Sequence, residues 1–171
     1  SITITGPNGV GKTLLLNTIV GYKSIFKGKI SINKINLSND PSNRQEHIGY
    51  YGHKTSLHTG LTVIETIEYW KAYYSSDANT SELIKFWDLP NKTVENCSEG
   101  QRKRIALVRL SLMNRNIWIL DEPTTNLDIV GKVKFLKLNT LHLRSGGLSI
   151  ITSLEPTQFD GTKIINLIKE I

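Results

Sequence analysis

The sequence contains one cysteine and no apolar run long enough to cross a bilayer. Cys97 alone cannot form a disulfide within the chain, which fits a reducing compartment, and we expect it to be a small packing residue. A membrane-spanning helix needs about 20 consecutive, mostly apolar residues, so we expect that the chain does not itself cross a membrane. A secretory signal peptide, an internal repeat and a heptad series are also missing. These absences argue against a disulfide-stapled domain and a repeat protein, and they leave a globular domain.

Acidic residues are fewer than basic ones, 15 against 21, which gives a net charge of +6. This excess is compatible with nucleic acid, anionic lipid or a phosphate ligand and does not choose among them. The basic residues are spread along the chain, so we expect most of them, including residues 102–104, on solvated helix or strand faces. The length is sufficient for one sizeable core, and we expect one domain over residues 1–171. Aromatic residues dominate cores, and we expect Trp70, Trp87 and Trp118 to take part in core or partial surface packing, with Trp118 of the central strand in the core.

Apolar periodicity divides the chain into alternating strands and helices. Strands are predicted at residues 1–6, 28–37, 48–53, 116–123, 148–152 and 162–171. Helices are predicted at residues 12–21, 61–74, 81–88, the segment after Gln101, and 130–144. The alternation predicts an α/β fold with a mainly parallel sheet, a small antiparallel patch near 28–37 and a helical subdomain over about 55–112. Because Ser1 already lies in a predicted strand, we expect a further segment to precede it.

Residues 6–13 read "GPNGVGKT" and lie between a predicted strand and a predicted helix. This is the setting in which the pattern G-x-x-x-x-G-K-[ST] forms a phosphate-binding loop. Lys12 is expected to reach the terminal phosphates of a nucleotide, and the Thr13 hydroxyl is expected to ligate Mg²⁺. The strand–helix context and the Lys–Thr pair favour this interpretation over a plain glycine-rich turn. The predicted loop consists of Gly6, Pro7, Asn8, Gly9, Val10, Gly11, Lys12 and Thr13.

Two acidic residues follow the apolar run "IWIL" at the predicted carboxyl end of a buried strand. Ligands of open α/β sheets bind at this edge. Asp121 suits Mg²⁺, through water, and Glu122 suits a general base that orients the attacking water, a role worth about 10²–10⁴ in rate. The alternative is an exposed acidic turn ended by Pro123, which is weak beside a phosphate-binding loop.

The stretch "CSEGQ" at residues 97–101 begins a helix on small polar residues. A helix N-terminus without bulky side chains binds anions. Ser98, through its hydroxyl, and Gly100, through its N–H, would then contact a terminal phosphate bound to another copy of the chain, with Glu99 turned away. The alternative is a simple cap by Ser98 without a ligand, and this stretch alone favours that alternative.

The segments "GPNGVGKT", "SEGQRKR" and "WILDEPTTNLD" in this order resemble the Walker A, signature, Walker B and D-loop motifs of the ABC-type ATPases. The resemblance covers almost the whole chain and implies a P-loop NTPase fold that binds and hydrolyses ATP with Mg²⁺. In that family two nucleotide-binding domains enclose two ATP molecules, and each signature segment faces the partner's Walker A loop. The resemblance therefore implies a homodimer, with Ser98, Gly100 and Gln101 in the signature, and Asn126 and Asp128 in the D-loop.

Residues 50–70, "YYGHKTSLHTGLTVIETIEYW", place His53 where the family usually has the Q-loop glutamine. Together with the other motifs this segment is similar to the ATP-binding subunits of haem exporters in cytochrome c maturation. The similarity implies a peripheral protein on the cytoplasmic face of the inner membrane, working with separate membrane-spanning subunits. It also implies that His53 lies near the Mg²⁺ or water region of the nucleotide site.

Two departures from the family pattern affect function. The family's adenine-stacking aromatic residue would lie in the segment expected before Ser1. At the switch, the family usually has two small residues and a histidine, and this chain has Thr152, Ser153 and Leu154. Leucine cannot hydrogen-bond a phosphate, so we expect normal ATP binding with slow turnover unless another residue supplies the contact.

Two other functions remain in view. One is an ABC-type ATPase acting on nucleic acid or ribosomes, which the net charge would suit, but the segment between Thr13 and Ser98 has none of the coiled-coil heptads that DNA-repair members carry. Nucleic acid is therefore not the expected partner. The other is a regulatory domain that binds ATP without hydrolysing it, motivated by Leu154.

Overall fold

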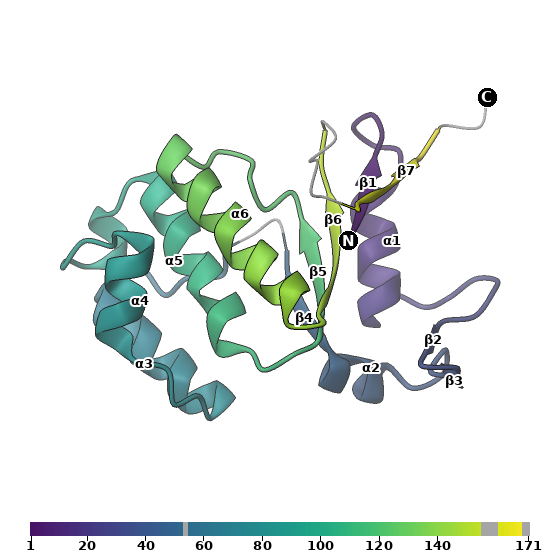
Figure 1. Ribbon diagram of the computed structural model, residues 1–171, viewed down its shortest axis with the longest axis horizontal. Coiled ribbons are helices and arrows are strands. Elements are labelled where there is room, and N and C mark those ends of the chain that lie inside the picture. Colours follow the sequence, from purple (N-terminus) through teal and green to yellow (C-terminus); the bar gives the residue numbers. More distant parts are fainter. Residues whose placement is uncertain (53–54, 155–160, 169–171) are drawn as a thin grey trace. The chain divides into compact units, whose positions relative to one another are not determined.

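The computed structural model of the chain describes residues 1–52, 55–154 and 161–168 (Figure 1). The described residues form two compact units. One comprises the described parts of 1–52, 115–123 and 143–171, and the other those of 53–114 and 124–142. The segment of about 55–112, expected to be a helical subdomain, lies in the second unit, which also contains residues 124–142.

A parallel sheet forms the centre of the first unit. Its strands, in spatial order, are β4 (Ile48–Tyr51), β5 (Ile117–Asp121), β6 (Leu148–Thr152), β1 (Ile2–Thr5) and β7 (Lys163–Asn166). Every pair in it is parallel. The predicted parallel α/β fold is confirmed. Four of the five residues of β5 are buried, as the continuous apolar run predicted for a central strand.

Helix α1 (Lys12–Val20) packs on this sheet through its apolar side. Leu16 and Val20 join Ile4, Ile48 and Ile119 in one buried cluster. The helix ends at Gly21, which has φ 100°, and a Cβ there would lie 2.8 Å from the Cβ of Pro41. Glycine is therefore required both by the left-handed backbone and by the close approach of the next segment.

Helix α2 (Pro41–His47) was not predicted from the sequence. The Asp40 side chain caps it by accepting from the Asn43 N–H at 3.0 Å, and Pro41 occupies its first turn. Arg44, which is 2% exposed, donates to the Thr18 carbonyl at 2.7 Å. The guanidinium thus satisfies a carbonyl of the last turn of α1, where a cation is favoured.

A small antiparallel pair lies between α1 and α2 in the sequence. Strands β2 (Ser31–Ile32) and β3 (Ile35–Asn36) are joined by Asn33 and Lys34, both with positive φ, as a two-residue hairpin turn requires. The antiparallel patch predicted near 28–37 is confirmed.

Helices make up most of the second unit. They are α3 (Val63–Tyr74), α4 (Thr80–Trp87), α5 (Glu99–Leu112) and most of α6 (Ile129–Arg144), with a short 3-10 turn, η1 (Val94–Asn96). A capping box begins α3, in which the Thr62 hydroxyl accepts from the Glu65 N–H and the Glu65 carboxylate accepts from the Thr62 N–H. Buried apolar residues of α5 form much of the core of this unit, and they include Ile105, Ala106, Leu107, Val108 and Leu110.

The three tryptophans are buried, with exposed fractions of 6% at Trp70, 0% at Trp87 and 4% at Trp118. The core position predicted for Trp118 is confirmed, and of the two alternatives for Trp70 and Trp87 the structure shows core packing. Cys97 is also buried, and burial raises the pKa of its thiol, which agrees with a packing role. The prediction of a solvated face for residues 102–104 is wrong for two of them, because Lys103 and Arg104 are buried. Within the described part of the chain, the helices lack the combination of length and hydropathy that crossing a bilayer demands.

Candidate nucleotide-binding site

The predicted phosphate loop connects β1 to α1 in the first unit. Gly6 has φ 148°, and a Cβ on it would lie 2.6 Å from the carbonyl oxygen of Leu167, so only glycine fits beside the end of β7. Gly11 precedes α1 with φ 106° and provides no side-chain cap. The N–H groups of the first turn are therefore left for a ligand, and the helix dipole favours an anion there.

Lys12 is folded back over the start of the loop. Its ammonium donates to the carbonyl oxygens of Gly6 at 2.7 Å and Pro7 at 3.2 Å, and the residue is only 6% exposed. An ammonium has three protons, and these two carbonyls account for two of them. A cation held by the backbone of a glycine-rich loop before a helix N-terminus fits the terminal phosphates of a nucleotide.

Asp121 ends strand β5 and is 2% exposed. Its Oδ2 accepts from the Thr13 hydroxyl at 2.8 Å, and its Oδ1 accepts from the Thr152 hydroxyl at 2.7 Å. A hydroxyl and a carboxylate in contact are the hard oxygen ligands that Mg²⁺ takes in proteins. Among the described residues, Asp, Glu, His and Cys side chains form no group of three that would hold a metal ion. Mg²⁺ sites commonly use one or two protein oxygens beside phosphate and water, which is the number that Thr13 and Asp121 offer.

Glu122 directly follows and has the left-handed φ of 48°, which is uncommon for a residue with a side chain. Its backbone N–H donates to the Thr152 hydroxyl at 2.9 Å. Asp121, the predicted Mg²⁺ ligand, and Glu122, the predicted general base, therefore both hydrogen-bond the side chain of Thr152. Thr152 was identified in the sequence only as part of the switch segment. Its parallel register with Asp121, which no local pattern reveals, places it here.

Tyr50 on β4 is a further neighbour of this site, and the sequence analysis did not identify it. Its hydroxyl donates to the Asn17 side chain at 2.9 Å, and its ring meets that of Tyr22 edge to face at 5.4 Å. Burial raises the pKa of Tyr50 to about 12, and the negative charge of Asp121 acts in the same direction. Tyr50 therefore remains a neutral donor at physiological pH.

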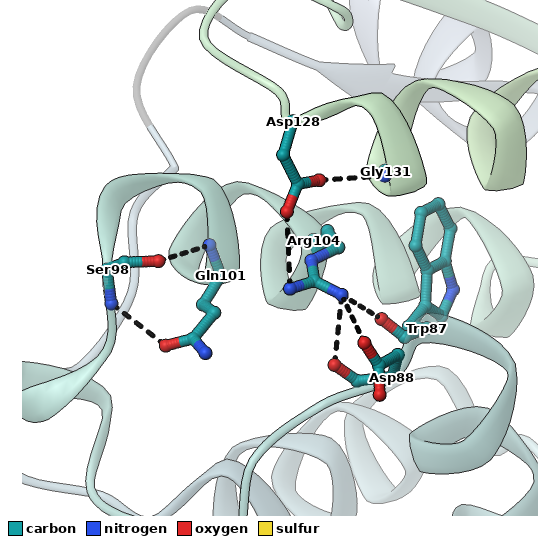
Figure 2. Close-up of polar contacts among 7 residues, drawn as sticks. All are labelled: Trp87, Asp88, Ser98, Gln101, Arg104, Asp128 and Gly131. Atoms are coloured by element: carbon teal, nitrogen blue, oxygen red, sulfur yellow. Dashed lines mark hydrogen bonds and ion pairs between the residues drawn. The ribbon is translucent and has the colours of Figure 1, made fainter.

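The signature segment begins α5 in the second unit. The Ser98 hydroxyl accepts from the Gln101 N–H at 3.2 Å, and the Gln101 side chain accepts from the Ser98 N–H at 3.0 Å (Figure 2). The two residues thus form a capping box, so the simple cap considered from the sequence does exist. Among the described residues outside the helix's own first turn, the atom nearest to a Cβ on Gly100 would be the N of Asp128, at 3.8 Å. A methyl group at position 100 would therefore meet these neighbours at ordinary van der Waals distance.

The D-loop residues pack beside this helix start. Asn126 donates from its side chain to the Glu99 carboxylate at 2.8 Å, which gives Glu99 a partner within the chain. Asp128 Oδ1 accepts from the Gly131 N–H at 2.8 Å in the first turn of α6, and Oδ2 lies 3.4 Å from a guanidinium nitrogen of Arg104. Asp128 is thus held by its own helix and by α5.

Arg104 connects three segments of the second unit (Figure 2). One terminal nitrogen donates to the carbonyls of Trp87 and Asp88, both at 3.0 Å, and to the Asp88 carboxylate at 3.2 Å. The other faces Asp128. A planar guanidinium can bond several acceptors at once, which a solvated side chain would not need. The position of a basic residue directly before the apolar run of residues 105–108 was the available signal for this network.

The predicted site residues fall into two groups. The loop of residues 6–13, Asp121 and Glu122 lie in the first unit, whereas Ser98, Gly100, Gln101 and Asp128 lie in the second. His53 lies outside the described residues. Leu154 follows the end of β6 by two residues and is 53% exposed.

Comparison with known proteins gives a consistent picture. Residues 1–125 match the family model of the ABC transporter. The cytochrome c biogenesis ATP-binding export protein CcmA of Nitrobacter winogradskyi is 33% identical over 161 residues, covering 91% of this chain and 78% of that protein. The protein of the same name from Histophilus somni is 35% identical over 161 residues, covering 89% and 73%.

Solved structures share the fold. A Pyrococcus furiosus protein assigned as an ABC transporter ATP-binding protein superposes with a TM-score of 0.81 at 27% identity, covering 97% of this chain and 83% of that one. The dimeric ATP-binding cassette MJ0796, bound to ADP and Pi, has a TM-score of 0.74 at 24% identity, covering 90% and 74%. The P-loop architecture predicted from the sequence is therefore confirmed.

Proposed function

The chain belongs to the ABC transporter family, and from this premise we propose that it is the ATP-hydrolysing subunit of an exporter that serves cytochrome c biogenesis. The observation that carries the ATPase part is the contact of Thr13 with Asp121 beside Lys12, at the carboxyl edge of the sheet. The relatives named above support the cytochrome c part. We further propose haem as the transported group, separate membrane-spanning partners, and a peripheral position on the cytoplasmic face of the inner membrane.

Binding of the nucleotide uses the loop of residues 6–13. The backbone N–H groups and the Lys12 ammonium bind the phosphates, while Thr13 and Asp121 hold Mg²⁺. Bound Mg²⁺ neutralises negative charge on the phosphates. Glu122 orients the attacking water and accepts its proton, which as general-base catalysis is worth about 10²–10⁴ in rate.

A second copy of the chain completes the site in this proposal. The Ser98 hydroxyl and the Gly100 N–H would contact the terminal phosphate held by the partner. The position of Gly100 in the first turn of α5 supports this role, because a Cβ there would meet its nearest reported neighbours among the described residues only at 3.8–3.9 Å, so their packing does not itself demand a glycine. Gln101 and Asp128 would then act by holding helix α5, since Gln101 bonds Ser98 at the helix start and Asp128 pairs with Arg104 further along the same helix. His53 is proposed to lie near the metal or the attacking water.

The test uses the full chain and a matched pair of variants. Glu122→Gln should bind ATP normally and form an ATP-dependent dimer, while turnover falls by about 10²–10⁴. Glu46→Gln, on the exposed face of α2, is the control and should keep full turnover. Equal rates in the two variants would exclude Glu122 as the base. Co-purification of the chain with nucleic acid in place of a membrane protein would contradict the exporter assignment.

A second function, ATP binding without hydrolysis, is favoured by Leu154. Its apolar side chain occupies the position where the family has a switch histidine, and it cannot bond a phosphate. A wild-type chain that forms an ATP-dependent dimer without measurable turnover would support this second function.

A further inference from the structure

We infer that Thr152 is a positioning residue of the nucleotide site, which fixes the Mg²⁺ ligand Asp121 and the general base Glu122 relative to each other. This inference rests on the proposed function. We place Thr152 itself out of contact with metal and nucleotide, because it is 0% exposed and its hydroxyl bonds Asp121 and Glu122. Its action is therefore indirect, through the two residues that do.

The direction of both hydrogen bonds follows from the atoms involved. A backbone N–H can only donate, so the Thr152 oxygen must accept from Glu122. The single hydroxyl proton then remains for Asp121, whose ionised carboxylate can only accept. One hydroxyl thus satisfies both neighbours, and no other arrangement of its proton does.

Asp121 is held from two sides by this arrangement. Thr13 on α1 donates to one carboxylate oxygen at 2.8 Å, and Thr152 on β6 donates to the other at 2.7 Å. With both oxygens bonded, the carboxylate plane cannot rotate freely. When Mg²⁺ binds, the Thr13 oxygen can turn a lone pair toward the ion and still donate its proton to Asp121. The bond from Thr152 then holds the other carboxylate oxygen and maintains the orientation of the carboxylate.

Glu122 is held at its backbone, in a conformation that needs support. A φ of 48° is a sparsely populated region for a residue with a Cβ, and such conformations persist where surrounding bonds determine them. The N–H of Glu122 bonds Thr152 at 2.9 Å. Without this acceptor, the turn after β5 would lose one determinant of the direction in which the Glu122 side chain leaves the chain.

The sheet makes Thr152 a rigid support. The residue is 0% exposed and ends β6, with Asp121 of β5 and Ile4 of β1 as its register partners on the two sides. The next residue continues the ladder, because the Ser153 N–H donates to the Ile4 carbonyl at 3.1 Å. A side chain fixed in this way cannot follow its partners if they shift.

The experiment compares Thr152→Val, which removes the hydroxyl at nearly constant volume, with Thr152→Ser, which keeps it. Thr66→Val is the matched control, because Thr66 is 2% exposed and its hydroxyl bonds only the Thr62 carbonyl among the described contacts. For each purified full-length variant, we would measure ATP affinity in EDTA, the Mg²⁺ concentration for half-maximal nucleotide-induced stabilisation, and kcat.

Thr152→Val should leave ATP affinity in EDTA unchanged, because Lys12 and the loop are intact. It should raise the half-saturating Mg²⁺ concentration and lower kcat by about 10- to 100-fold, as loss of residues that support metal ligands does. Thr152→Ser and Thr66→Val should resemble the wild type. If Thr152→Val does not fold, Thr152→Ser and Thr152→Ala, which differ by one hydroxyl, give the same comparison.

Three results would overturn the inference: unchanged Mg²⁺ dependence in the hydroxyl-free variant, an equal loss in Thr152→Ser, or an equal loss in Thr66→Val. A wild-type chain that binds no ATP at all, with or without Mg²⁺, would instead refute the proposed function. The two failures are therefore distinguishable.

Discussion

Replacement of Arg104 by methionine tests how the second unit is held together. Methionine is unbranched and replaces the apolar stem of the side chain, but it is shorter and lacks the guanidinium. The change breaks four contacts: those with the Trp87 and Asp88 carbonyls and those with the Asp88 and Asp128 carboxylates. These contacts differ in how much their loss costs.

The two carboxylates contribute little to the cost, because water replaces the guanidinium around them. Their side chains are 73% exposed at Asp88 and 48% exposed at Asp128. Exposed ion pairs are typically worth about 0–1 kcal/mol. The bond to the Trp87 carbonyl is buried, and a buried acceptor left without a partner costs about 1–3 kcal/mol. The substitution also removes the cost of burying the charged guanidinium. The free energy of unfolding should therefore fall by a net value of about 2–3 kcal/mol.

The assay is thermal and guanidinium unfolding of the full chain. For a domain of this size a loss of 1 kcal/mol lowers Tm by about 2–4 °C, so Arg104→Met should lower Tm by about 4–12 °C. Asp88→Asn removes only the exposed pair and should cost less than about 1 kcal/mol. If Asp88→Asn costs as much as Arg104→Met, the exposed carboxylate and not the buried carbonyl would be the main contact, and this reasoning would be refuted.

Three further predictions address the signature, the switch and the tyrosine beside Asp121. Gly100→Ala should leave ATP binding and folding intact but lower turnover by roughly 10²-fold, because a misplaced phosphate contact costs that much; Gly60→Ala, an exposed glycine with no neighbour within 4 Å, is the control. Leu154→His should raise steady-state turnover by about tenfold or more, since one charge-stabilising donor is worth roughly 10²–10³, and an unchanged rate would count against Leu154 as the cause of slow hydrolysis. Tyr50 has a folded-state pKa of about 12 against 10.0, so the stability it contributes is complete below pH 10 and is lost as pH rises toward 12. Tyr50→Phe should therefore make denaturant stability fall less steeply between pH 10 and 12, and identical slopes would disprove the linkage.

Elements with strong apolar periodicity were predictable from the sequence, and α2 shows why others were not. Its seven residues, "PSNRQEH", include no large apolar side chain, so a periodicity argument has nothing to detect. The helix instead depends on the Asp40 cap and on the bond of Arg44 to α1. The cap and the proline were visible in the sequence as a helix-start signal, whereas the tertiary bond was not.

Arg104 was misplaced for a related reason. Charges at residues 102–104 have the appearance of a solvated face when only neighbouring residues are considered. The acceptors of Arg104 lie 16 or 17 residues earlier, at Asp88 and Trp87, and a further partner is Asp128. Whether a basic residue beside an apolar run is buried depends on such distant acceptors, which a local pattern does not contain.

The nucleotide site shows the same division between local and non-local information. Four residues of the site were predicted because each belongs to a short motif whose residue types indicate its chemistry. They are Lys12, Thr13, Asp121 and Glu122. Thr152 belongs to no such motif, and it reaches Asp121 only because β5 and β6 pair in parallel with these two residues in register. In a parallel sheet, the register partner of a ligand-binding carboxylate ends its strand at the same edge and faces the same way. A hydroxyl at that position is therefore a rational place to look for the residue that holds the carboxylate, once the strand order is known.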